Sequence, residues 1–306
     1  MLFPGQASQY VGMGKDIYES SAAVRELYDF AGQEIGEDIA EISFTGPAEK
    51  LKQTRFTQPA ILLHSLAVLT VLDGAVEAGY AAGHSLGEYG ALVASGSLTA
   101  KDAIRLVVKR ASLMESSSCE KTGTMAAIIG MNLKAVEDLC AEVSTTEEVV
   151  VAANINSPVQ IVVSGDVTAV EKLAALAKER GAKRAVKLEV GGAFHSPLMQ
   201  SAKDGMFSAL ADIEIQAPTM TFVPNVTAQS VTDPEEIRKL LVQQITSPVR
   251  WAQTMDCMKN ANIKHVIEVG PGKVLTGLAK RALGPENSVT LDTLKDIETI
   301  LSPAAS

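Results

Sequence analysis

The sequence predicts an α/β fold in which a large subdomain with a parallel sheet carries a smaller inserted subdomain. A short strand at residues 80–83 runs through a tight turn into a small, apolar helix at residues 87–95, as in the strand–turn–helix units of parallel sheets. Between residues 124 and 190, strands and amphipathic helices follow a different order. We therefore expect residues 1–123 and 191–306 to form the large subdomain and residues 124–190 the small one.

The composition is that of an ordinary globular protein, and it argues against several classes of function. The chain has 306 residues, of which 46% are hydrophobic, and its net charge of −9 disfavours nucleic-acid binding. No apolar run approaches the ~20 residues of a membrane span, and the N-terminal residues show no signal peptide. The three cysteines lack metal-site spacing and suggest a reducing compartment. We expect a cytoplasmic protein with no metal, nucleic-acid partner or membrane partner.

The N-terminal part of the large subdomain is predicted to be mostly helical. Residues 3–9 resemble a strand end that enters a glycine-rich turn, and residues 13–35 and 47–54 have helical patterns. Pro59 suits the first position of the next helix, whose apolar face extends to Leu72.

The turn after residues 80–83 is Gly83-His84-Ser85-Leu86-Gly87, a G-x-S-x-G pattern typical of a nucleophile elbow in an α/β-hydrolase-like subdomain. A serine hydroxyl reacts only if it is held exposed, beside a base and close to oxyanion donors. Flanking glycines permit the sharp turn, and the N–H of Leu86 opens the next helix, where the dipole favours negative charge. A chance Gly-Ser turn is the alternative interpretation of this stretch alone.

The helix expected at residues 100–117, capped by Thr99, carries Arg105, Lys109 and Arg110. Such a cluster is commonly a solvated basic face. The sharper hypothesis is that one arginine points into the site, where its planar guanidinium holds a carboxylate through two hydrogen bonds.

The predicted small subdomain has the order βαββαβ of the ferredoxin-like split motif. Its boundaries lie at glycine-bearing segments, residues 121–123 and 191–192. The six expected elements, in order, are residues 125–131, 134–143, 148–154, 160–164, 168–180 and 183–190.

His195 is the best placed of the four histidines to act as a base. It lies on a loop at a subdomain boundary, just before the helix start at Ser196-Pro197, and such loops often carry catalytic groups. Of the others, His64 is expected on an apolar helix face and His84 beside the elbow serine. His265 is expected in a strand at residues 263–269.

The expected base lacks an obvious acidic partner. Ser85 precedes His195, as in α/β hydrolases, but Glu189 is the only carboxylate close upstream of the histidine. We therefore expect a neutral group, an amide or a backbone carbonyl, to orient the base. This weakens the hydrolase hypothesis and fits acyl transfer to a positioned acceptor.

The C-terminal region is predicted to alternate strands and helices. Its expected elements are a strand at residues 221–225, helices at 234–244 and 251–259, the strand at 263–269, and a helix at 274–282 after the turn Gly270-Pro271-Gly272.

Taken together, these motifs resemble the malonyl-CoA:acyl carrier protein transacylases of fatty acid synthesis and the acyltransferase domains of polyketide synthases. The resemblance covers nearly the whole chain and keeps the family's motif order. The motifs are residues 3–9, 83–88, 109–110, 192–197, 244–248 and 268–272. One departure is Ala7, where the family usually has glycine.

The resemblance implies a function and assigns roles. Ser85 would take the malonyl group from malonyl-CoA as an ester and pass it to the phosphopantetheine thiol of acyl carrier protein, with no bound cofactor. His195 would be the general base and acid, and Arg110 would bind the malonyl carboxylate. The N–H groups of Gln6 and Leu86 would form the oxyanion hole.

Two further residues receive roles from the same resemblance. Gln244 would orient His195, through its backbone carbonyl, and Phe194 would select malonyl over branched acyl groups. The alternatives are a serine hydrolase or thioesterase that uses the same Ser-His pair, and a non-enzymatic scaffold.

Overall fold

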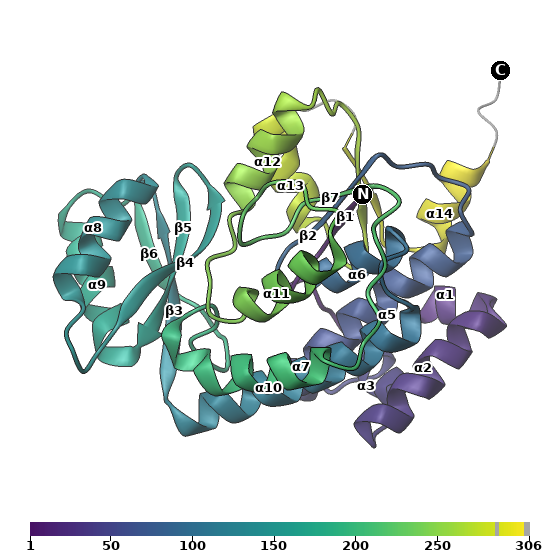
Figure 1. Ribbon diagram of the computed structural model, residues 1–306, viewed down its shortest axis with the longest axis horizontal. Helices are drawn as coiled ribbons and strands as arrows, with labels where there is room; N and C mark the ends of the chain where they lie inside the picture. The colour runs from purple at the N-terminus through teal and green to yellow at the C-terminus, as the bar shows by residue number, and fades with distance from the viewer. Residues whose placement is uncertain (285–287, 303–306) are drawn as a thin grey trace.

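The computed structural model describes residues 1–284 and 288–302. It contains a five-stranded and a four-stranded sheet in two adjoining regions (Figure 1). The larger region holds the first and the last of the described residues, and the smaller region, in teal, is formed by the middle part of the chain. The predicted α/β class, with a parallel sheet and a separate antiparallel sheet, is confirmed.

The five-stranded sheet of the large region is parallel throughout, in the order β7-β2-β1-β8-β9. Its middle strand, β1, has only two residues, and both are fully buried. Phe3 packs into the main core, whereas Leu2 packs on the opposite face of the sheet. The strands are β1 (Leu2–Phe3), β2 (Tyr80–Gly83), β7 (Thr221–Phe222), β8 (Val266–Val269) and β9 (Ser288–Leu291).

Helices cover both faces of this sheet, because its strands present apolar side chains on each side. On one side α5 packs against α6, α7 and β8, and on the other α12 packs against α13. The helices of the large region are α1 (Lys15–Ser20), α2 (Ala22–Ile35), α3 (Ile39–Phe44), α4 (Ala48–Leu51), α5 (Thr54–Leu72), α6 (Gly87–Ala94), α7 (Ala100–Glu120), α10 (Gln200–Leu210), α11 (Pro234–Gln244), α12 (Trp251–Asn260), α13 (Val274–Leu283) and α14 (Leu294–Leu301). A short 3₁₀ helix, Pro197–Met199, precedes α10.

The four-stranded sheet confirms the predicted βαββαβ order. Its strands are antiparallel in the order β4-β5-β3-β6, and α8 and α9 pack on its outer side (Figure 1). These helices and strands enclose a core of their own. The elements are β3 (Gly123–Ile129), α8 (Leu133–Val143), β4 (Val150–Ser157), β5 (Gln160–Asp166), α9 (Val167–Glu179) and β6 (Arg184–Lys187).

Backbone hydrogen bonds join the two regions. The edge strand β4 pairs with Val249 of the large region: the N–H of Ile155 donates to the Val249 carbonyl at 2.9 Å, and the N–H of Val249 donates to the Ala153 carbonyl at 2.8 Å. Subdomain boundaries at residues 123 and 191 stay a prediction.

The predicted start of α5 is wrong. Pro59 was expected at its first position, but it lies inside the helix, which begins at Thr54. The preceding turn is buried, and the Thr57 hydroxyl donates to the Leu51 carbonyl, so tertiary packing outweighs the missing proline N–H.

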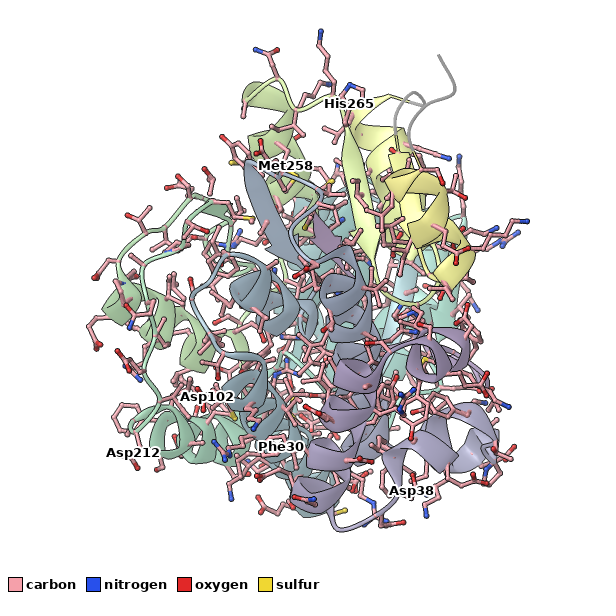
Figure 2. The ribbon with its side chains drawn as sticks, turned by 90° about the vertical axis from the view of Figure 1, so that its right-hand side faces the viewer. Phe30, Asp38, Asp102, Asp212, Met258 and His265 are labelled. Atoms are coloured by element: carbon pink, nitrogen blue, oxygen red, sulfur yellow. The ribbon has the colours of Figure 1, made fainter. Side chains whose placement is uncertain are left out.

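Other differences concern breaks and short elements. The single helix expected at residues 13–35 is two helices, because Ser21 is extended and its side chain caps α2. His265 lies just before β8 and not within it, at the upper end of the molecule in Figure 2. The elements α3, β9 and α14 were not predicted, since each is short.

One helix, α5, is long and apolar enough by composition to cross a membrane. Of its most apolar 18-residue window, 78% is buried inside the protein, as in the core helix of a globular fold.

We predict that two helical glycines respond oppositely to alanine. A Cβ on Gly90 of α6 would lie 2.7 Å from Cδ1 of the buried Phe3 ring, whereas a Cβ on Gly277 of α13 meets nothing within 4 Å. Gly90→Ala should lower the free energy of unfolding by about 1–3 kcal/mol through overpacking. Gly277→Ala should raise it by about 0.5–1 kcal/mol through helix propensity. Chemical denaturation measures both, and equal effects would contradict the close packing of α6 on β1.

Candidate active site

The elbow after β2 is as tight as the glycine pattern predicts. Ser85 has φ 52°, in the left-handed region that costs a residue with a side chain about 1–2 kcal/mol. A Cβ on Gly83 would lie 1.9 Å from the backbone carbon of Gly87, and a Cβ on Gly87 would lie 2.1 Å from the Phe3 carbonyl oxygen. Only glycine fits at these two positions, so the turn can present the Ser85 hydroxyl above the sheet.

The structure brings Ser85 and His195 together, although 110 residues separate them. Ser85 Oγ lies 2.8 Å from His195 Nε2, and His195 Nδ1 lies 2.8 Å from the backbone carbonyl of Gln244. A carbonyl can only accept, so Nδ1 carries the proton and Nε2 is free to accept the serine proton. This is the tautomer that a general base requires.

Gln244 takes the place that an acid holds in an aspartate-containing triad. It is the last residue of α11, and carbonyls at a helix C-terminus carry partial negative charge. That charge stabilises a protonated imidazole less than a full carboxylate does. The side-chain amide of Gln244 donates from Nε2 to the Ser85 carbonyl at 3.0 Å, so one residue contacts both members of the pair.

The imidazole of His195 is only 3% exposed. Burial, together with the nearby Arg110 cation, lowers its pKa to about 3. At neutral pH the ring is therefore uncharged and available as a base.

Arg110 is fully buried and faces the serine. Its Nη2 donates to Ser85 Oγ at 3.0 Å and to the Gln244 side-chain oxygen at 2.9 Å, while Nη1 donates to the side-chain oxygen of Gln58 at 2.6 Å. Within residues 1–284 and 288–302, no carboxylate forms a salt bridge with this guanidinium. Burial lowers its pKa, but an arginine stays charged at neutral pH. The site thus holds a cation partnered only by neutral groups.

The other arginine of α7 lies on the surface. Arg105 contacts Asp102 and Glu34, and its guanidinium lies 5.1 Å from the centre of the Phe30 ring. Figure 2 labels Phe30 and Asp102 on this outer face. The helix therefore carries one buried and one solvated arginine, as its periodicity allows.

Gln6 and Leu86, whose backbone amides are the predicted oxyanion donors, both line the cavity beside Ser85. Gln6 follows β1 and Leu86 precedes α6, and the two segments are joined by the β1–β2 pairing of Phe3 with Gly83. Among the described residues, neither amide has a hydrogen-bond acceptor. Two free donors near a serine hydroxyl can stabilise an oxyanion.

The cavity at this site has a volume of about 250 Å³ and lies between the two sheets. Ser85, His195 and Arg110 line it, with Phe194 beside them. Its apolar walls come from both regions of the chain and include Met114, Met125, Val162, Leu188 and Val190. His84 links the two regions here, since its Nε2 donates to the side-chain oxygen of Asn156 at 2.9 Å.

Comparison with known proteins places this geometry in a family. Residues 1–294 match the family model described as acyl transferase domain. The chain belongs to this acyl transferase family. It is 41% identical to the malonyl CoA-acyl carrier protein transacylase of Bacillus subtilis, over 92% of this chain and 89% of that protein. It is also 41% identical to the enzyme of that name from Haemophilus influenzae, over 98% of this chain and 97% of that protein.

Solved structures give the same relationship for this acyl transferase. A crystal structure of acyl-carrier-protein S-malonyltransferase from Bartonella henselae superposes with a TM-score of 0.92 at 40% identity, covering 98% of this chain and 97% of the other. A complex described as a type II polyketide synthase acyl-carrier protein with its malonyl-transacylase gives a TM-score of 0.92 at 38% identity, covering 98% of each chain.

Sequence reasoning missed three buried polar residues of this acyl transferase site. Gln58 holds Arg110, Asn225 contacts the elbow, and Glu88 lies in the first turn of α6, where burial raises its pKa to about 8. The signal for Glu88 was a charge inside an otherwise apolar helix. Gln58 carries no local pattern that would have marked it. Asn225 stands at the end of the strand predicted at residues 221–225, a possible loop site, but the pattern gave it no role.

The backbone conformation of Ala7 explains why related proteins usually have glycine at this position. Its φ is 80°, in the left-handed region where glycine fits best, so the alanine side chain is strained at this position. Its own N–H donates to the Gln9 side chain at 2.8 Å, which stabilises the loop.

We predict that the reactivity of Ser85 is insensitive to pH between 7 and 5. With the His195 pKa lowered to about 3, the neutral base persists throughout this range. A histidine of ordinary pKa, about 6.5, would lose more than roughly tenfold in neutral fraction by pH 5. The measurement is the rate of Ser85 labelling by a serine-directed fluorophosphonate, followed by mass spectrometry. An acid limb centred near pH 6.5 would contradict the lowered pKa.

Proposed function

We propose that this protein transfers the malonyl group of malonyl-CoA to the phosphopantetheine thiol of acyl carrier protein, through an ester on Ser85. The named relatives support the reaction class. The observation that carries the substrate choice is Arg110, a buried cation with no anionic partner among the described residues, 3.0 Å from Ser85 Oγ. In a malonyl thioester the free carboxylate is separated from the reacting carbonyl by one methylene, so it can reach this guanidinium.

In the first half of the reaction, His195 Nε2 takes the proton of Ser85 Oγ as that oxygen attacks the thioester carbonyl. The resulting oxyanion receives hydrogen bonds from the N–H groups of Gln6 and Leu86. The carbon–sulfur bond then breaks, and the proton on His195 passes to the CoA sulfur. The products are a malonyl ester on Ser85 and free CoA.

The second half repeats these steps in reverse order with a new thiol. His195 removes the proton of the phosphopantetheine thiol, whose sulfur attacks the Ser85 ester. The carbon–oxygen bond breaks, and His195 returns the proton to Ser85 Oγ. These steps use side chains and backbone amides alone, and both thiol substrates use the same cavity in turn.

Transfer requires that water reacts more slowly than the acceptor thiol. The apolar cavity walls limit water, and the carbonyl of Gln244 supports a weaker base than an aspartate would. The hydrolase alternative shares the Ser85–His195 pair, and it predicts rapid loss of the ester without an acceptor. Supplying the extender unit of fatty acid synthesis is the pathway role that we propose, in the cytoplasm, where the three free cysteines would stay reduced.

The direct test of this function is the intact mass of the protein after mixing with malonyl-CoA. We expect one malonyl adduct on the wild-type chain and none on Ser85→Ala. Ser208→Ala, an exposed serine on α10, is the control and should still form the adduct. Adding acyl carrier protein should remove the adduct with matching malonylation of the carrier, whereas equal loss without the carrier would favour a hydrolase.

The role of Arg110 is tested by acyl selectivity. We expect Arg110→Ala to slow malonyl transfer by roughly 100-fold, because a buried charge pair is worth about 2–5 kcal/mol when one member is removed. Transfer from acetyl-CoA, which has no carboxylate, should fall much less. Arg105→Ala, the exposed arginine of the same helix, is the matched control and should leave both rates unchanged. An equal fall for malonyl and acetyl groups in Arg110→Ala would contradict the carboxylate role.

A further inference from the structure

The strained backbone of Ser85 is held from a distant part of the chain. Asn225 lies just after β7, the strand beside β2, and it is fully buried. Its side-chain oxygen accepts the Ser85 N–H at 2.7 Å, and its side-chain Nδ2 donates to the Gly83 carbonyl at 2.6 Å. A single side-chain amide thus binds the backbone on both sides of His84. These two bonds fix the peptide that leads into the left-handed conformation of Ser85.

Asn225 is itself fixed in place by its own backbone. Its N–H donates to a carboxyl oxygen of Glu88, and its carbonyl accepts the N–H of Arg250 at 3.1 Å. Glu88 is only 1% exposed and lies in the first turn of α6, where its own N–H donates to the Ser85 carbonyl at 3.1 Å. The end of β2, the loop after β7 and the start of α6 are therefore joined in one hydrogen-bonded ring around the elbow.

We propose that Asn225 is a positioning residue for acyl transfer, which holds Ser85 Oγ at His195 and the Leu86 N–H toward the cavity. It contacts no reacting atom in the proposed mechanism and acts only through the backbone of the elbow. Without it, the Ser85 N–H and the Gly83 carbonyl would be buried without partners, and the strained φ of Ser85 would lose its restraint. This inference rests on the proposed function of Ser85.

The geometry separates positioning from substrate binding. Asn225 does not line the cavity, whereas Arg110 does. Loss of Asn225 should therefore change the rate of ester formation and leave the affinity for malonyl-CoA nearly unchanged. A role in stability alone would lower the melting temperature and leave the rate of ester formation per folded molecule intact.

The test measures ester formation in a single turnover, by quenched-flow mass spectrometry, together with the dissociation constant of malonyl-CoA. We expect Asn225→Ala to slow ester formation by about 10- to 100-fold, as misplacement of a reacting group by about 1 Å can do. The dissociation constant should stay within about threefold. Labelling of Ser85 by a fluorophosphonate should slow in parallel, since that reaction needs the same elbow but no malonyl group.

Two further variants keep the result interpretable. Asn225→Asp keeps the acceptor for the Ser85 N–H and loses the donor to Gly83, so its rate should fall more than twofold below that of the wild type but stay above that of Asn225→Ala. If Asn225→Ala does not fold, Asn225→Asp provides the test of the positioning role in its place. Asn132→Ala removes a comparable asparagine side chain that caps α8, far from the site, and should lower stability without slowing ester formation.

The outcomes distinguish this inference from the function on which it rests. If the wild type forms no malonyl ester, the proposed function fails. If the wild type forms the ester and folded Asn225→Ala or Asn225→Asp does so within twofold of its rate, the positioning role fails and the function stands.

Discussion

The buried guanidinium of Arg110 carries a full positive charge, and most of the polar groups of the site are arranged around it. Isolated buried cations are costly, so they are normally paired with an acid. Arg110 instead receives two side-chain amide oxygens and a serine hydroxyl. These dipoles solvate the guanidinium without neutralising it. Burial lowers the pKa of the neighbouring His195 imidazole, and the Arg110 charge lowers it further, so the ring stays neutral. Under the proposed function, the same charge would also receive the carboxylate of the substrate.

Gln244 connects the base and the cation because it contacts Ser85, His195 and Arg110. Its side chain accepts from Arg110 and donates to the Ser85 backbone, while its own carbonyl accepts from His195. A carboxylate in this place would pair with the arginine and compete with the substrate. A neutral residue at a helix end avoids that competition, which explains why the histidine has no acidic partner even though the elbow resembles that of a hydrolase.

Much of the site's geometry was predictable from sequence because it depends on local structure. The glycines around Ser85 predict a tight turn that few other residues permit. The helix start at Ser196-Pro197 indicates that His195 lies on a loop. The resemblance supplied the roles of Arg110 and Gln244, which local patterns left open. Gln58 and Asn225 escaped prediction, since their importance lies in partners 52 and 140 residues away. The start of α5 was predicted wrongly from Pro59, because burial of the preceding turn outweighs a local helix-start signal.

The hydrogen bonds between the two regions bear on how the inserted segment could be exchanged between related chains. The interface between the regions runs through β4, Val249 and the His84–Asn156 contact. A chimaera that exchanged only the inserted segment would bring in a foreign edge strand and a foreign partner for His84, the residue next to Ser85. A stable exchange would therefore need crossover points that keep both sides of this interface from one parent.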